Sequence, residues 1–290
     1  MYVTLLGTGT STGVPILSCD CAVCASPDPR DRRTRTSCLV RVGDLRIVID
    51  TGPDFHRQAL REQIDRIDAV CYTHHHFDHV AGIDDLRPFL FENADPIPCY
   101  GSEATCRHLS DRHPYIFGER PYPSAPRLEL RPIDDRFAVG DRYETGHDNG
   151  HASGPGDGEG HEPEPVEVDV VPIPLLHGDL PVLGYRIGPF AYLTDASRIP
   201  PASYDRLQGV RVLVLDALRE RPHPSHFSFE EAVEVAERIG AEHTYFVHLT
   251  HAMRHAALDE HLPEGIHPGH DGLEVRIPEP ERATPCTYSS

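Results

Sequence analysis

The sequence predicts an α/β (α+β) fold in which two β-sheets pack face to face between outer helices, as a four-layer αββα sandwich. Two observations lead to this prediction. Short apolar segments typical of strands form two groups along the chain, and amphipathic segments typical of helices follow within each group. Several of the strand-like segments also end in a lone histidine or aspartate, which would place polar groups in one shared cleft.

The first group of strands occupies the first hundred residues, where apolar and β-branched residues recur in short runs. The predicted strands are Tyr2–Leu6, Ser37–Val42, Leu45–Asp50, Ala69–Tyr72 and Ile97–Tyr100. Two helices are predicted between them, one over Pro53–Gln63 with a proline near its first turn and one over Gly82–Phe91.

The second group begins after residue 165. The predicted strands are Val166–Pro172, Leu183–Ile187, Ala191–Thr194, Val210–Leu215, Thr244–Val247 and Leu273–Ile277. An amphipathic helix is predicted over Phe229–Ile239, because Ser228 can cap it and Glu231 follows three residues later. A further helix is predicted near Ala252–His261.

The chain of 290 residues is predicted to form one domain over residues 1–290. Residues 144–165 are rich in Gly, His, Glu, Asp and Pro, so we expect a mobile acidic loop there. Its histidines, His147, His151 and His161, are interpreted as solvated loop residues.

The formal net charge is −19, and all 27 basic residues are arginine. Such a charge disfavours nucleic acid and anionic membranes as partners, so any anionic substrate must be attracted locally. No run of about 18 apolar residues is present, and the first residues lack the features of a signal peptide. We therefore expect a cytoplasmic protein.

The run His74-x-His76-x-Asp78-His79 has the spacing of a metal site. It follows the apolar stretch Ala69–Tyr72 and precedes a segment in which a helix can begin. His74 and His76 alternate by two and can lie on one side of an extended chain, while Asp78 and His79 can reach a second position. Imidazole and carboxylate ligands suit Zn²⁺, Mn²⁺ or Fe²⁺.

Four residues do not complete two metal shells, so later parts of the chain must supply more ligands. Three polar residues, His177, Asp195 and His248, each close an apolar strand-like segment. Each of them alone could be a helix cap or a core residue with satisfied hydrogen bonds. Their joint occurrence after the histidine run favours a two-metal centre.

These residues resemble the metal set of the metallo-β-lactamase superfamily, and the resemblance extends from Leu5 to about His251. It implies a binuclear centre of Mn²⁺ or Zn²⁺. The implied ligands are His74, His76 and His177 for the first metal, Asp78, His79 and His248 for the second, and Asp195 as the bridge. Asp50 would orient these ligands from behind.

A second metal site is indicated by Cys19-x-Cys21-x-x-Cys24, within a loop at about residues 16–35. Thiolates this close together favour a structural Zn²⁺. No fourth cysteine lies nearby, so the candidate fourth ligand is His251, with His255 as the alternative.

The sequence resembles the PhnP-type phosphoribosyl cyclic phosphate phosphodiesterases of the carbon–phosphorus lyase pathway in three features. These are the three cysteines Cys19, Cys21 and Cys24, called the cysteine clip below, the segment Leu6–Pro15 and the pair His248-x-x-His251. In that family the cysteines and the second histidine of the pair bind structural zinc, and an upstream histidine, matched here by His226, acts in catalysis.

The implied reaction is hydrolysis of a small phosphodiester or cyclic phosphate. The predicted catalytic residues are His226 and Asp78. A metal-bridging hydroxide would attack phosphorus, and His226 would protonate the leaving alkoxide. Asp216 could orient the His226 imidazole. A homodimer is the expected assembly.

Two other functions fit parts of this pattern. The Gly-Thr-Gly segment near the start and the metal set also resemble tRNA 3′-processing endonucleases, although no basic RNA-binding arm is visible. The clip also resembles a non-hydrolytic group of quinone-cofactor biosynthesis proteins, whose metal run is degraded, whereas the run here is complete. Thioester or lactam hydrolysis is compatible with the fold, but the cysteine clip argues against both.

Overall fold

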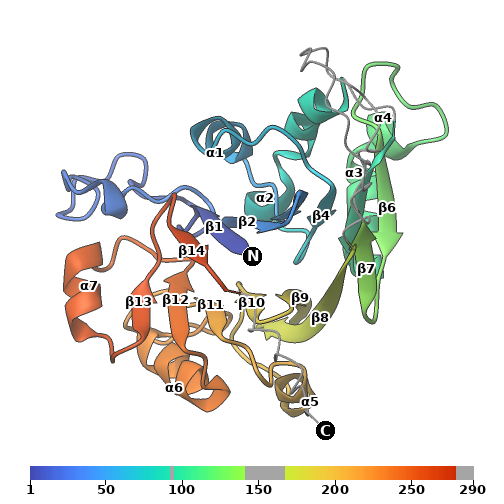
Figure 1. Ribbon diagram of the computed structural model, residues 1–290. Coiled ribbons are helices and arrows are strands. Elements are labelled where there is room, and N and C mark those ends of the chain that lie inside the picture. The colour runs from blue at the N-terminus through green and yellow to red at the C-terminus, as the bar shows by residue number, and fades with distance from the viewer. Residues whose placement is uncertain (92–94, 141–166, 279–290) are drawn as a thin grey trace, which may run out of the picture.

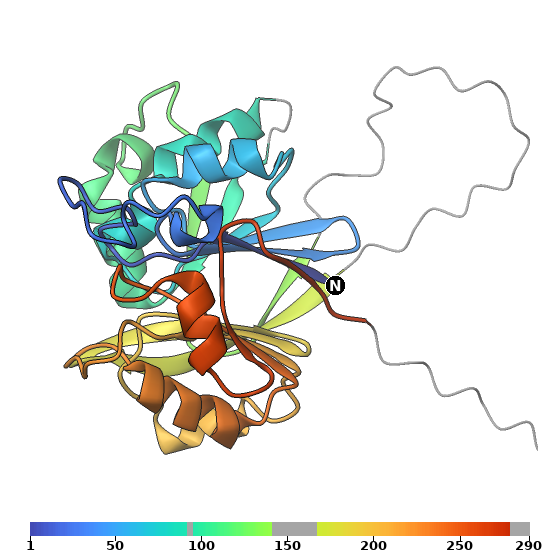
Figure 2. The ribbon, with the colours of Figure 1, turned by 90° about the vertical axis from the view of Figure 1, so that its left-hand side faces the viewer.

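The computed structural model describes residues 1–91, 95–140 and 167–278. Within these ranges two seven-stranded sheets lie face to face with helices on their outer faces, as Figures 1 and 2 show. The predicted four-layer αββα sandwich is therefore confirmed. The N-terminal half of the chain forms most of one sheet, and the C-terminal half forms most of the other.

The first sheet has the order β14 (Glu274–Arg276), β1 (Tyr2–Gly7), β2 (Ser37–Val42), β3 (Leu45–Ile49), β4 (Ala69–Cys71), β5 (Ile97–Gly101) and β6 (Leu128–Pro132). The helices of this half are α1 (Phe55–Arg61), α2 (Phe77–Val80), the 3₁₀ helix η2 (Ile83–Leu90), α3 (Glu103–Arg112) and α4 (Pro114–Phe117). Strands β3 to β6 run parallel, so their carboxyl ends share one edge.

The second sheet has the order β13 (Ile266–Pro268), β12 (His243–Val247), β11 (Val212–Asp216), β10 (Phe190–Leu193), β9 (Leu180–Ile187), β8 (Glu167–His177) and β7 (Phe137–Gly140). Its half of the chain contains α5 (Pro201–Asp205), α6 (Phe229–Ile239) and α7 (His255–His261), and a short 3₁₀ helix, η1 (Pro29–Asp31), lies in the cysteine loop. Ser228 caps α6 in the predicted capping box with Glu231.

Alternation along the strands builds the core as separate apolar layers. In β3, Ile47 and Ile49 pack between the two sheets, whereas Val48 packs under the outer helices. In β11, Val212 and Val214 face the centre, and the residues between them face the helices of the other side. Because both faces of each sheet are covered, the central strands consist of continuous apolar runs.

The structure differs from the prediction at short or weakly patterned elements. The sequence did not predict β6, β7, β13, α3, α4 or α5. Strand β6 is mostly exposed and alternates leucine with charged residues, and β7 has only four residues, so neither carries a strong apolar signal. The segment predicted as a helix over Gly82–Phe91 is a 3₁₀ helix with Pro88 inside it, a residue that cannot donate an α-helical hydrogen bond.

Strand β8 extends to His177 and is longer than predicted. The loop 144–165, with His147, His151 and His161, lies outside the described residues. Across the described parts of the chain, no helix is long and apolar enough to span a bilayer.

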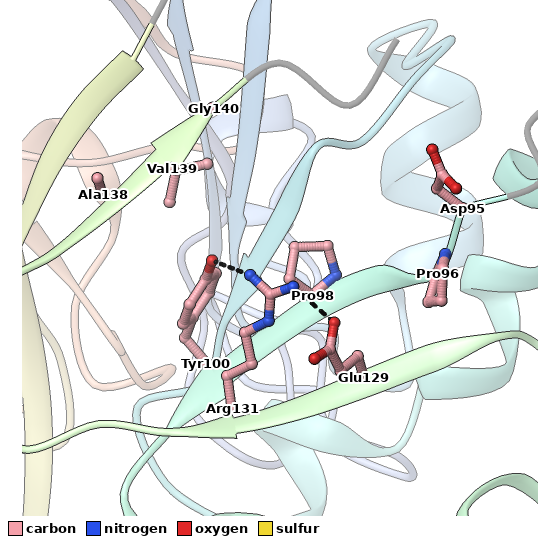
Figure 3. Close-up of a pocket in the computed structure, with 9 residues that line it drawn as sticks. All are labelled: Asp95, Pro96, Pro98, Tyr100, Glu129, Arg131, Ala138, Val139 and Gly140. Atoms are coloured by element: carbon pink, nitrogen blue, oxygen red, sulfur yellow. Dashed lines mark hydrogen bonds and ion pairs between the residues drawn. The ribbon is translucent and has the colours of Figure 1, made fainter. Parts of the chain in front are cut away.

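One hollow of about 330 Å³ lies between β5, β6 and β7 (Figure 3). Arg131 donates a hydrogen bond to the Tyr100 hydroxyl and pairs with Glu129 at 2.6 Å, so its charge is already balanced. None of the predicted metal ligands lines this hollow. The candidate functional site therefore lies elsewhere.

Candidate metal centre and active site

The candidate site lies where the carboxyl ends of several strands meet. Strands β10, β11 and β12 are parallel, and Asp195, Asp216 and His248 stand at or just after their ends. Strand β3 runs parallel to β4 in the other sheet, so Asp50 and the histidine run share a second edge. The two edges lie next to each other across the sandwich. The Tyr185 hydroxyl on β9 donates a hydrogen bond to the Tyr72 carbonyl at 2.7 Å, and His79 Nε2 lies 3.2 Å from Asp195 Oδ1.

Three residues of this site adopt an unusual backbone conformation. Asp50, Asp195 and His248 have φ values of 63°, 51° and 61°, in the left-handed region that non-glycine residues rarely enter. Such a conformation costs roughly 1–2 kcal/mol for each residue. Each lies just beyond a strand, where the turn directs a ligand side chain into the cleft. A shared strain at these positions is typical of a functional site.

A first donor group consists of His74, His76, His177 and Asp195, whose ligand atoms all lie within 4.8 Å of one another. The Asp195 Oδ2 atom is 3.6 Å from His74 Nε2 and 4.0 Å from His177 Nε2. The rings of His74 and His76 meet edge to face at 4.5 Å. This group could hold one metal ion.

A second donor group consists of Asp78, His79, His248 and again Asp195. Here the other carboxylate oxygen, Asp195 Oδ1, lies 3.2 Å from His79 Nε2 and 3.3 Å from His248 Nε2. Asp78 Oδ2 lies 3.4 Å from His79 Nε2. The two oxygens of Asp195 therefore face different donor groups, which is the arrangement that a bridging carboxylate requires.

The histidines are held from behind, so that their Nε2 atoms converge. His79 Nδ1 lies 2.7 Å from Asp50 Oδ2, and His177 Nδ1 lies 2.7 Å from the Ser225 carbonyl. His74 Nδ1 lies 3.0 Å from the Thr73 hydroxyl. Partners of this kind fix the tautomer and the ring orientation of a histidine that ligates metal.

Asp50 is fully buried and also accepts hydrogen bonds from the Thr73 amide and hydroxyl at 2.8 Å each. The chain that follows Asp50 passes close to the backbone of α2 at Gly52. A Cβ atom on Gly52 would lie 2.0 Å from the Asp78 carbonyl oxygen. The chain after β3 can therefore pass this close to the ligand run only with glycine at this position.

The buried carboxylates and histidines of the site influence one another's charge. Burial opposes ionisation of Asp195, but the positive charges of His248 and His79 outweigh this effect and lower the pKa of Asp195. Burial likewise opposes a charge on His79, yet the carboxylates of Asp195 and Asp50 raise the pKa of His79 well above its usual range.

Within the part of the chain that the structure describes, the buried Nε2 atoms of His74, His79 and His248 have no hydrogen-bond partner. Unpartnered buried polar atoms are costly unless something else satisfies them. A divalent cation in each donor group would satisfy both these nitrogens and the buried carboxylates, so the residues fit a metal centre.

His226 lies beside the second donor group. Its ring stacks on His248 at 4.6 Å and meets His177 edge to face at 4.5 Å. Its Nδ1 atom lies 3.1 Å from Asp216 Oδ1, which leaves Nε2 for a different partner. Asp216 also accepts from the amides of Asp195 and Phe227 at 3.2 and 3.0 Å, so this buried carboxylate is held in place.

The cysteine clip is assembled as the sequence suggests. The Sγ atoms of Cys19, Cys21 and Cys24 each lie 3.4 Å from His251 Nδ1. Donors around a tetrahedral Zn²⁺ with Zn–S of ~2.3 Å and Zn–N of ~2.0 Å stand roughly 3.5 Å apart. The four donors therefore fit a zinc ion.

The thiols of the clip differ in acidity. A hydrogen bond from the Cys24 amide lowers the pKa of Cys21 to about 6, so that this thiol ionises readily at neutral pH. Burial raises the pKa of Cys24 to about 11. The alternative fourth ligand, His255, lies away from the clip, where its amide donates to Asp31 Oδ1 and its ring meets His270 at 5.7 Å.

A buried ion pair connects the clip loop to the chain that carries His248 and His251. Arg33 and Asp31 pair at 3.2 Å, and both are almost completely buried. The Arg33 guanidinium donates to the carbonyls of Thr250 and Met253. The segment between the two candidate metal sites is thus anchored by Arg33, a residue that the sequence analysis did not single out.

The structure brings together all eleven predicted metal ligands, as two four-membered donor groups that share Asp195 and as the clip. His75 is excluded from both groups and stacks on His108 at 4.5 Å. Sequence reasoning missed Thr73, Ser225 and Arg33. Thr73 lies next to the run and could have been noticed, whereas the other two act through contacts distant in the sequence.

The chain is similar in sequence and in fold to known proteins. Residues 45–249 match the family described as the β-lactamase superfamily domain. The chain superposes on a diphosphatase from the PhnP family with a TM-score of 0.80 and 40% identity, over 94% of this chain and 96% of that one.

Two relatives align over most of this chain. The chain is 40% identical over 284 residues to an octanoyltransferase of Porphyromonas gingivalis, covering 96% of this chain but only 52% of that protein. It is 26% identical to ribonuclease Z of Methanopyrus kandleri, covering 86% of this chain and 94% of that protein. The chain thus spans about half the length of the first relative and nearly all of the second.

The fold and the two donor groups define a hydrolase of the metallo-β-lactamase fold. The chain belongs to the β-lactamase superfamily and, within it, to the PhnP family.

Proposed function

We propose that the chain is a binuclear metal-dependent phosphodiesterase that hydrolyses a small phosphodiester or cyclic phosphate, of the ribosyl cyclic phosphate or cyclic nucleotide type. One observation supports this proposal most directly. Two donor groups share Asp195, and an imidazole held by a buried carboxylate stands beside them. Two cations with an adjacent proton donor suit displacement at phosphorus.

We propose the following ligands. His74, His76 and His177 hold the first metal, Asp78, His79 and His248 hold the second, and Asp195 bridges them; Cys19, Cys21, Cys24 and His251 hold a structural zinc. Asp50 and Asp216 position the residues in front of them. Mn²⁺ or Zn²⁺ suits the active site, since its donors are imidazole nitrogens and carboxylate oxygens.

The proposed reaction divides the work between ions and residues. When bound, the two divalent ions supply Lewis acidity, which polarises a phosphoryl group and lowers the pKa of water. The carboxylates of Asp78 and Asp195 would offset part of the positive charge of the two ions. His226 donates a proton from Nε2 to the leaving oxygen, while Asp216 keeps the ring in position through Nδ1.

The test is an assay of metal-reconstituted protein on bis(p-nitrophenyl) phosphate, 2′,3′-cyclic nucleotides and ribosyl cyclic phosphates. Turnover that requires added metal and disappears in His76→Ala is the expected result. His243→Ala, an exposed histidine at the start of β12, is the matched control. Faster hydrolysis of thioesters or lactams than of any phosphodiester would contradict the proposal.

A second candidate is an RNA-processing nuclease, since the alignment with ribonuclease Z covers nearly all of both chains. A net charge of −19 works against a long polyanion, because binding of nucleic acid depends on releasing counterions with basic residues. Tight, salt-dependent binding of tRNA with cleavage at its 3′ end would favour the nuclease. The octanoyltransferase is about twice as long as this chain, which aligns with only 52% of it.

Several other expectations stay predictions: one domain over residues 1–290, a cytoplasmic location and a homodimer. A mobile acidic loop at 144–165 is a further one, and it lies beyond the residues that the structure describes.

A further inference from the structure

A largely buried carboxylate outside the two donor groups joins two segments that are far apart in the sequence. Asp271 lies between β13 and β14, and its Oδ1 atom accepts hydrogen bonds from the Thr8 amide at 3.0 Å and the Thr8 hydroxyl at 2.9 Å. Its Oδ2 atom accepts from the Thr34 amide and hydroxyl at 2.8 and 2.5 Å. Arg61 pairs with the same oxygen at 3.3 Å. The carboxylate therefore fixes Thr8 relative to Thr34.

The two threonines belong to a small patch in which three chain segments pair through their backbones. Gly9 lies between Arg35 and Leu249 and pairs with both in parallel. The Gly9 amide donates to the Thr34 carbonyl at 2.8 Å. Thr8 directly precedes Gly9, and Thr34 directly precedes Arg35. Asp271 therefore sets the spacing of two of the three segments at the end where they enter the patch.

The third segment of the patch carries a proposed metal ligand, because Leu249 directly follows His248. The Leu249 amide donates to the Thr8 carbonyl at 2.9 Å, and the Leu249 carbonyl accepts from the Thr10 amide at 3.2 Å. The Leu249 side chain is buried in the core on the same side as Phe246. Both backbone groups of the residue next to His248 are thus held by the segment that Asp271 fixes.

His248 depends on such support more than the other proposed ligands do. The Nδ1 atoms of His79 and His177 each have a partner at 2.7 Å, whereas His248 Nδ1 is 3.7 Å from Asp216 Oδ1. Among the residues that the structure describes, neither ring nitrogen of His248 has a hydrogen-bond partner. Its backbone φ of 61° is also one that a non-glycine residue keeps only when the surrounding structure enforces it. The orientation of the His248 ring therefore depends on how its backbone is held.

We propose that Asp271 is a positioning residue for the second metal, and that it acts on His248 through Thr8 and the backbone of Leu249. This inference rests on the proposed function, in which His248 is a ligand of that metal. Asp271 belongs to neither donor group, so its carboxylate orients a ligand and does not bind the ion. The first metal should not depend on Asp271, because its histidine ligands lie on other segments of the chain.

The test compares the wild type with Asp271→Asn and with a matched control, Asp68→Asn. Asparagine keeps the size of the side chain but replaces one acceptor oxygen by an amino group, which accepts no hydrogen bond. Asp68 is also a buried carboxylate, which accepts from the Arg46 amide at 2.7 Å and pairs with Arg66 at 2.9 Å. It lies just before β4, at the edge of the sheet opposite the donor groups. A general loss of stability should therefore appear in both variants, and a loss of the second metal only in Asp271→Asn.

Each protein is loaded with Co²⁺ and dialysed against a series of buffered free Co²⁺ concentrations, and its metal content is measured by elemental analysis. We expect one metal equivalent of Asp271→Asn to require about 10–100-fold more free Co²⁺ than in the wild type and in Asp68→Asn. The visible spectrum of the depleted Asp271→Asn protein should match that of His248→Ala and not that of His76→Ala. Equal metal retention in Asp271→Asn and Asp68→Asn, or a spectrum that matches His76→Ala, would overturn the inference.

A milder pair of variants decides the question if Asp271→Asn does not fold. Thr8→Val removes the hydroxyl donor to Asp271 and keeps the amide donor, so one metal equivalent should require about 2–10-fold more free Co²⁺. Thr8→Ser keeps both donors and should retain the wild-type affinity. Equal affinities in Thr8→Val and Thr8→Ser would refute the role of this contact.

Metal retention is measured without turnover, so failure of this inference can be distinguished from failure of the proposed function. If the wild type hydrolyses no phosphodiester, but Asp271→Asn and His248→Ala lose the same metal equivalent, the proposed function fails and the positioning role is supported. If the wild type hydrolyses phosphodiesters and only His248→Ala loses that equivalent, the proposed function is supported and the positioning role is refuted.

Discussion

Replacement of His226 by alanine should separate proton donation from metal binding. The His226 ring lies against His248 and contacts Asp216 through Nδ1, which leaves Nε2 as the proposed donor to the leaving oxygen. General acid catalysis contributes roughly 10²–10⁴-fold to rate, which corresponds to about 2.7–5.5 kcal/mol of transition-state stabilisation. We therefore expect turnover of an alkoxide-releasing substrate to fall by this factor in His226→Ala.

The assay should use two substrates with different leaving groups, with metal content measured by elemental analysis. A cyclic nucleotide releases a poor alkoxide leaving group, whereas bis(p-nitrophenyl) phosphate releases a stable phenolate that needs little protonation. The loss in His226→Ala should be much smaller on the second substrate, and three metal equivalents should remain. His243→Ala should match the wild type on both substrates, because that side chain is exposed and remote from the site.

Two results would refute this reasoning. His226 also belongs to a donor group with Asp195, Asp216 and His248, whose ligand atoms lie within 4.8 Å of one another. Loss of a metal equivalent in His226→Ala would make His226 a ligand rather than a proton donor. An equal loss on both substrates with full metal content would show that His226 acts on a step other than leaving-group departure.

Three further predictions concern the supports of the site. Cys21→Ser should lose one metal equivalent and lower the melting temperature before activity falls; unchanged metal content by elemental analysis would exclude a zinc site. Arg33→Met leaves Asp31 buried without its partner, so urea unfolding should show a loss of about 3–5 kcal/mol, and a loss below about 1 kcal/mol would contradict this role. Burial lowers the pKa of His255 from 6.5 to about 4, so the unfolded chain binds the proton first as pH falls. Wild-type stability should therefore drop between pH 6.5 and pH 4 by up to about 3 kcal/mol, a drop that His255→Leu should lessen in urea titrations across this range.

The sequence predicted most of the fold and the donor set because the site lies at strand ends. A buried strand appears in the sequence as a short apolar run, and a polar residue directly after it can be recognised from the sequence alone. His177, Asp195 and His248 were found in this way. Because β10, β11 and β12 pair in parallel, the residues that follow these strands all lie at the same edge of the sheet.

Contacts distant in the sequence could not be predicted in this way. Ser225 holds His177 through a carbonyl oxygen that any residue could supply, so its identity carries no signal. Arg33 resembles any surface arginine in sequence, although the fold buries it against Thr250 and Met253. A hollow of about 370 Å³ beside His226 is likewise lined by three segments, around Thr10, Arg219 and Thr250, that only the fold brings together.

The placement of Asp216 links the parts of the site into one unit. Its carboxylate accepts from the Asp195 amide, contacts His226 Nδ1 at 3.1 Å and lies 3.7 Å from His248 Nδ1. One buried group at the end of β11 thus contacts the proposed bridging carboxylate, a proposed ligand of the second metal and the proposed proton donor. Because one residue at the end of a buried strand contacts all three, we expect the proposed proton donor to keep a constant distance from the two donor groups.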